Sequence, residues 1–107
     1  MKILHISNIE TQSNGIYSVL SVLVKEQRAL GNSVQIININ KKSELTSTLF
    51  TNIRSFSKFK DYIFNYNPNI VIFHSVYSIL YILFAILLRI KKIPYLIELH
   101  GALSQEN

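Results

Sequence analysis

Four short runs of aliphatic and β-branched residues alternate with stretches that carry apolar residues at helical spacing, and this alternation allows few folds. Each run is short, apolar and bounded by polar or turn-forming residues, which is typical of a buried strand. The four runs are Ile3–Ser7, Val34–Asn40, Ile70–His74 and Tyr95–Leu99. Strands that alternate with helices form a parallel sheet covered on both faces. We therefore expect a single α/β domain with a parallel sheet of about four strands.

The first predicted helix starts at Gly15 and is ended by Gly31, which supplies a left-handed residue. Ser13 or Asn14 can cap its start. Its apolar positions recur at i, i+3, i+4, i+7, i+11 and i+14, interrupted only by Gln27, and predict one stripe that packs on the sheet. The members of this stripe are Ile16, Val19, Leu20, Leu23, Gln27 and Leu30.

Two further helices are predicted over Ser57–Asn65 and Tyr77–Lys91, and prolines follow both. The stretch 41–55 is polar and weakly patterned, so we expect a loop there, with room for one short helix or strand. Residues 76–88 form the most apolar stretch, but thirteen residues are too few to span a bilayer. We interpret the stretch as a buried helix, and its basic end leaves peripheral contact with an anionic membrane open.

The charge and composition of the chain limit the kinds of partner and of site that we expect. The formal net charge is +5, yet no run reaches five like charges, so a solvated basic surface is favoured over a nucleic-acid site. The chain has no cysteine, which excludes disulfides and thiolate metal sites. The first residues carry too short an apolar run for a secretory signal. We expect a cytoplasmic protein, with a peripheral position at the inner face of the membrane left open.

Ligands of open parallel sheets bind beyond the carboxyl ends of the strands. That rule selects the segments that follow the four predicted strands: Asn8–Gly15, Asn40-Lys41, His74-Ser75 and His100-Gly101. Gly15 opens a helix, whose free N–H groups suit a phosphate, although a glycine can also serve only to make the turn. For His74 and His100, a ligand contact and a purely structural role both stay open. His5 lies within a strand, where a structural role is favoured.

Several cofactor classes lack their sequence signatures. A dinucleotide fingerprint needs three glycines, and only Gly15 is present, so NAD and FAD are not supported. The lysine of a phosphate-binding P-loop is missing as well. The sequence has no cluster of metal-ligand residues, and the pair Glu98 and Glu106 is one that chance readily supplies. We expect neither a metal nor a cofactor.

Five segments in this order resemble family 4 of the retaining glycosyltransferases with the GT-B fold, and together they cover nearly the whole chain: residues 1–7, 14–17, 29–34, 68–74 and 94–101. The resemblance implies a Rossmann-like, acceptor-side N-terminal domain that faces a donor domain across a cleft. By this resemblance Asn14 and Gly15 approach the phosphates of a nucleotide sugar, and His100 is the catalytic residue. His74, Ser75 and Gly101 line the cleft on the acceptor side.

The resemblance also implies that the C-terminal donor domain is missing, so that residues 1–107 are part of an enzyme. The complete enzyme transfers a sugar from a nucleoside diphosphate to a glycan or a lipid-linked acceptor, and we expect the isolated chain to be inactive. The alternative is a non-catalytic module, truncated or split, that binds an acceptor or pairs with a separate donor domain. An unpaired sheet edge and an uncovered apolar helix face are further expected to promote self-association.

Overall fold

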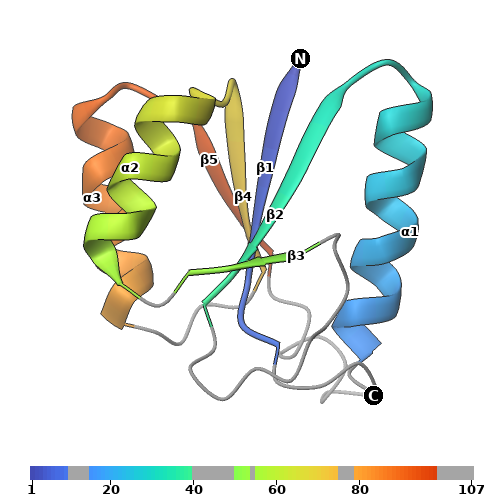
Figure 1. Cartoon of the computed structure of the whole chain (residues 1–107), viewed down its shortest axis with the longest axis horizontal. Helices are drawn as coiled ribbons and strands as arrows, with labels where there is room; N and C mark the ends of the chain where they lie inside the picture. The colour runs from blue at the N-terminus through green and yellow to red at the C-terminus, as the bar shows by residue number, and fades with distance from the viewer. Residues whose placement is uncertain (10–14, 40–49, 54, 75–78, 99–107) are drawn as a thin grey trace.

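The computed structural model describes residues 1–9, 15–39, 50–53, 55–74 and 79–98. Five strands and three helices alternate along these segments (Figure 1). In chain order they are β1 (Lys2–Ser7), α1 (Gly15–Ala29), β2 (Ser33–Asn38), β3 (Phe50–Asn52), α2 (Phe56–Tyr66), β4 (Ile70–His74), α3 (Ile79–Ile90) and β5 (Tyr95–Glu98).

All strand pairs of the sheet are parallel, and the strand order is β3-β2-β1-β4-β5. The predicted α/β fold with a parallel sheet is therefore confirmed. The sheet has five strands rather than about four, because Phe50–Asn52 forms an additional edge strand beside β2. This strand lies within the polar stretch 41–55. It has only three residues, so the sequence offers no periodicity long enough to reveal it.

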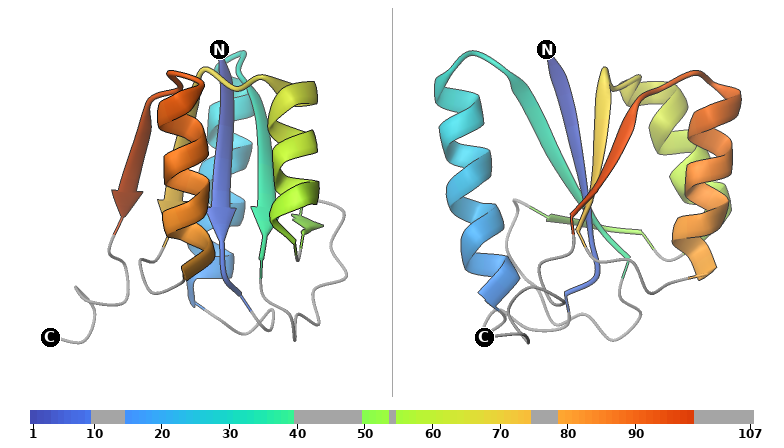
Figure 2. Two further views of the ribbon diagram at one scale, coloured as in Figure 1. Left: turned by 90° about the vertical axis from the view of Figure 1, so that its left-hand side faces the viewer. Right: turned by 180° about the vertical axis from the view of Figure 1, so that it is seen from behind.

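Helices cover both faces of the sheet, α1 on one face and α2 with α3 on the other (Figure 2). Two apolar cores result. The larger core joins inward residues of β1 and β4, such as Leu4 and Phe73, to Phe59 of α2 and Phe84 of α3, whose rings stack with centroids 3.7 Å apart. The smaller core lies beneath α1. Strands buried on both faces explain why the predicted strands read as continuous apolar runs.

The buried face of α1 differs from the predicted stripe. Leu20 and Val24 are buried against the sheet, whereas Val19 and Leu30 are exposed. The helix is therefore rotated relative to the expected stripe, and Tyr17 packs toward the edge of the sheet, where its ring stacks on Phe50 of β3. The prediction leaves a short strand within residues 41–55 open but does not place it, so it does not include this contact between Tyr17 and β3.

The helix ends follow local chemistry. Gly31 has a φ of 93° and ends α1 as predicted. Helix α2 begins one residue earlier than expected because the Ser55 hydroxyl accepts a hydrogen bond from the backbone N–H of Lys58 at 3.3 Å. Its last residue is Tyr66, and the next residue, Asn67, caps it: Asn67 is left-handed with a φ of 51° and donates its N–H to the Ile63 carbonyl. Pro68 thus follows a helix that asparagine has already ended.

Candidate functional site at the carboxyl edge of the sheet

The strand order creates a switch point between β1 and β4. From β1 the chain passes by way of α1 to β2 on one side, and it later returns to add β4 on the other side. The carboxyl ends of β1 and β4, at Ser7 and His74, therefore lie next to each other at the edge where the strands end; we call this edge the carboxyl edge (Figure 1). Open parallel sheets bind ligands at such a point.

Gly15 is the first residue of α1, at the carboxyl edge, and it is exposed. Its φ is not positive, since Gly31 is the one described glycine with a positive φ. A Cβ built on Gly15 meets nothing within 4 Å. Neither the backbone conformation nor the packing of the described residues therefore requires glycine here. The glycine leaves open space directly beside the first turn of a helix, where the positive end of the helix dipole favours anions.

Asn38, the last residue of β2, fixes the backbone that leaves β1. Its side chain is fully buried, and its Oδ1 accepts hydrogen bonds from the Ile9 backbone N–H at 2.7 Å and from the Ser7 hydroxyl at 3.0 Å. Its Nδ2 donates to the Ile9 carbonyl at 2.8 Å. One amide side chain thus bonds both backbone groups of Ile9, as a neighbouring strand would. It holds the start of the segment that leads to Gly15.

Asn38 was missed as a site residue. The predicted strand ran through Asn40, so the carboxyl edge was placed at Asn40-Lys41, both outside the described residues. A polar residue within an apolar strand was the available signal, because a buried amide needs hydrogen-bond partners. Ser7, at the end of β1, carries the same signal and is likewise fully buried.

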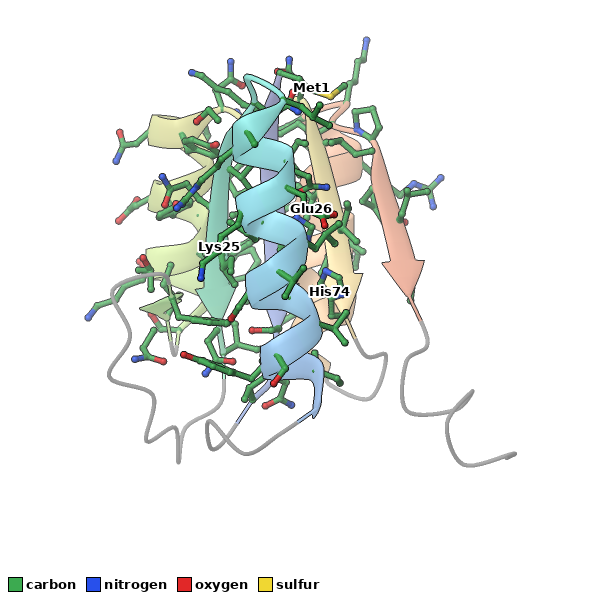
Figure 3. The ribbon with its side chains drawn as sticks, turned by 90° about the vertical axis from the view of Figure 1, so that its right-hand side faces the viewer. Met1, Lys25, Glu26 and His74 are labelled. Atoms are coloured by element: carbon green, nitrogen blue, oxygen red, sulfur yellow. The ribbon has the colours of Figure 1, made fainter. Side chains whose placement is uncertain are left out.

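A buried row of hydrogen-bonded polar side chains runs from α1 to the carboxyl edge, on the face of the sheet that α1 covers. His5 Nε2 lies 2.8 Å from Gln27 Oε1, and His5 Nδ1 lies 2.7 Å from His74 Nε2. The Gln27 oxygen can only accept, so His5 Nε2 carries a proton and donates it. In the neutral ring Nδ1 then accepts from the His74 Nε2–H. Both imidazoles are buried, and Figure 3 shows His74 near the end of β4 beside α1.

The chain of hydrogen bonds explains two features of the sequence. Gln27 interrupts the apolar stripe of α1 because its side chain meets a polar group inside the sheet. His5 has the structural role that its place within a strand favoured. His74 is 1% exposed, and its hydrogen bond to His5 links β4 to β1, the two strands that flank the switch point. A direct contact of His74 with an acceptor stays a prediction.

The other predicted site residues lie outside the described residues: Asn14, Ser75, His100 and Gly101. The structure therefore places Gly15, at the start of α1, and His74, at the end of β4, at the same edge of the sheet, whereas His100 lies outside the described residues. Among the described residues, no three His, Asp or Glu side chains gather closely enough to hold a metal ion. In the same part of the chain, no helix combines the length and apolar character needed to cross a membrane.

Comparisons with protein-family models, with curated proteins and with solved structures find no match for this chain.

Proposed function

We propose that this chain is the acceptor-side part of a glycosyltransferase that uses a nucleoside-diphosphate sugar. In the complete enzyme the bond between the sugar and the diphosphate breaks, and a glycosidic bond to an acceptor hydroxyl forms with retention. The observation that carries the proposal is Gly15, which opens α1 at the carboxyl edge although neither its φ nor the described residues around it require a glycine. A ligand that must approach the backbone closely accounts for such a glycine.

The chemistry of the site fits a diphosphate. The start of α1 carries the positive end of the helix dipole, which favours an anion. The first turn of α1 contains no acidic residue that would repel a phosphate. Asn38 fixes the path of the backbone at Ile9, at the end of the described segment that precedes Gly15.

The resemblance adds the residues that complete the proposal. Asn14 would share the phosphate contact, and His100 would act on the departing sugar as the catalytic residue. His74, Ser75 and Gly101 would line the acceptor side of the cleft. A second α/β domain would supply most of the donor site, so closure of the two domains would precede transfer. The isolated chain is accordingly expected to show no turnover with any nucleotide sugar.

Binding of nucleoside diphosphates to the purified chain tests the proposal. Titration of the ¹⁵N-labelled chain with UDP, GDP or ADP should shift the amide signals of Gly15 and Ile16 more than those of Val22 and Glu26, which lie farther along the same helix. The variant Gly15→Ala should fold normally, because its Cβ meets nothing within 4 Å, and should lose most of these shifts. If Gly15→Ala binds as tightly as the parent, or if the shifts occur elsewhere, the proposal is wrong. Stable pairing with a second chain but no nucleotide binding would favour the non-catalytic module.

A further inference from the structure

Positively charged side chains are concentrated at the opposite edge of the sheet. All three helices end at this edge, and the chain starts there (Figures 1 and 2). The segments that form it are residues 1–2, 28–33, 64–69 and 89–94, and we call it the amino edge. These segments contain no Asp or Glu and carry five of the eleven Lys and Arg residues of the chain: Lys2, Arg28, Arg89, Lys91 and Lys92.

Three of these cations are held in place by neighbouring groups. Arg28 donates from Nε and Nη2 to the Val34 carbonyl at 3.2 and 2.7 Å. Lys2 Nζ donates to the Tyr66 carbonyl at 3.2 Å, and Lys91 Nζ lies 3.8 Å from the centre of the Phe64 ring. These three cations therefore lie in defined positions, which reduces the entropy lost when an anionic partner binds.

Large apolar side chains project from the same edge. Leu30 is 82% exposed, Ile90 73% and Met1 68%, which makes them the three most exposed large apolar residues described. Phe64 is also exposed. Figure 3 shows Met1 at the opposite end of the sheet from His74, with the acidic Glu26 farther down α1. Cations near the ends of helices complement the helix dipoles, but that effect gives no reason for exposed aliphatic side chains between them.

We propose that the amino edge docks on an anionic membrane surface. Lys and Arg side chains are attracted to acidic headgroups, and aliphatic side chains between them enter the boundary between headgroups and acyl chains. A nucleic acid would pair with the cations but would gain nothing from Leu30 and Ile90. A second copy of the chain that paired symmetrically through this edge would bring two cationic edges together. The mixture of charge and aliphatic tips therefore favours lipid.

This docking leaves the carboxyl edge free. The molecule measures 36 × 33 × 27 Å, and the amino and carboxyl edges lie on opposite sides of it. A chain seated on its amino edge thus presents Gly15 away from the lipid. The inference does not depend on the proposed sugar transfer, because it rests on residues at the other end of the sheet.

Flotation with lipid vesicles tests the proposal, because vesicles and bound protein rise through a density gradient whereas protein aggregates sink. The chain should float with vesicles of phosphatidylcholine that contain about a quarter phosphatidylglycerol, and not with phosphatidylcholine alone. The double variant Arg89→Gln/Lys92→Gln should bind about 25-fold more weakly, since each cation near an anionic surface contributes about fivefold. The matched control Lys58→Gln/Lys60→Gln changes the net charge equally, but on the first half of α2, and should bind nearly as tightly as the parent.

A second pair of variants tests the apolar part of the surface. Leu30→Ser/Ile90→Ser should weaken flotation about tenfold or more, while Val19→Ser/Val22→Ser, on exposed positions in the middle of α1, should leave it unchanged. Circular dichroism confirms that each variant is folded. The proposal is overturned if neutral vesicles bind equally well, if the control pairs weaken binding as much, or if no vesicle binds. It is also overturned if a DNA duplex binds more tightly than the vesicles and Leu30→Ser/Ile90→Ser has no effect on either.

Discussion

The Nδ1 atom of His5 lies 2.7 Å from the Nε2 atom of His74, so two imidazoles on neighbouring strands are joined by one buried hydrogen bond. In the register of the sheet His5 is opposite Ile72, which places His74 diagonally across from it on the same face. The ring centroids are 5.0 Å apart. Because β1 and β4 flank the switch point, this bond links the two strands whose ends form the candidate site.

We predict that His5 and His74 contribute to stability as a unit. His5→Leu or His74→Leu alone should lower the free energy of unfolding by about 1–3 kcal/mol, because each leaves a buried polar group without its partner. The double variant should cost less than the sum of the two, with a coupling of about 1 kcal/mol. Urea denaturation followed by circular dichroism measures all four proteins, and additive losses would show that the two rings act independently.

Asn38 is expected to be more important for the loop after β1 than any other described side chain. Asn38→Ala should cost about 2–4 kcal/mol, since both buried backbone groups of Ile9 lose their partner. Asn69→Ala is the control, because Asn69 makes an exposed bond to the Lys2 backbone and should cost less than about 1 kcal/mol. Amide hydrogen exchange at Ile9 should accelerate in Asn38→Ala alone. Equal losses in the two variants would contradict this role of Asn38.

The sequence predicts the fold well because strands buried on both faces appear in it as continuous runs of apolar residues. Ile3–Ser7 and Ile70–His74 are recovered within one residue, and the alternation with helices implies the parallel pairing that is observed. The short strand β3 leaves no such signal. The prediction leaves a short strand open within residues 41–55 without placing it, so it also misses that Tyr17 of α1 turns toward Phe50.

The candidate site was less predictable because its contacts join residues distant in sequence. Gly15 could be found by its place after a strand. The link between Asn38 and Ile9 spans 29 positions, and the link between His5 and His74 spans 69. A polar residue within an apolar strand indicates that its side chain has a hydrogen-bond partner. Which residue that partner is depends on the strand order and the register. Neither follows from local patterns.

Alkaline pH should destabilise the chain through Tyr62. Burial, with a smaller effect from the neighbouring Tyr66, raises the pKa of Tyr62 from 10.0 to about 12. The folded state therefore holds this proton more tightly than the unfolded state, so the stabilisation is complete below pH 10 and is lost as the pH rises toward 12. The urea midpoint should fall over this range, and less so in Tyr62→Phe. Tyr17→Phe, on the other face of the sheet, serves as the control and should retain the full loss.

Strand β5 is the edge through which the chain is expected to self-associate. Leu96 is 54% and Ile97 49% exposed, and neighbouring residues of a strand point to opposite faces, so both faces of this edge are apolar. The other edge, β3, is short and exposes Thr51 and Asn52, which limits pairing there. A charge at Leu96 should therefore reduce association.

Sedimentation velocity across a concentration series should show oligomers of the parent chain. Leu96→Lys should weaken their association about tenfold or more, because pairing at β5 would bury the new charge. Val22→Lys adds the same charge at an equally exposed apolar position on α1 and corrects for general repulsion between chains. A parent chain that stays monomeric at every concentration, or equal effects of the two substitutions, would show that β5 is not the associating edge.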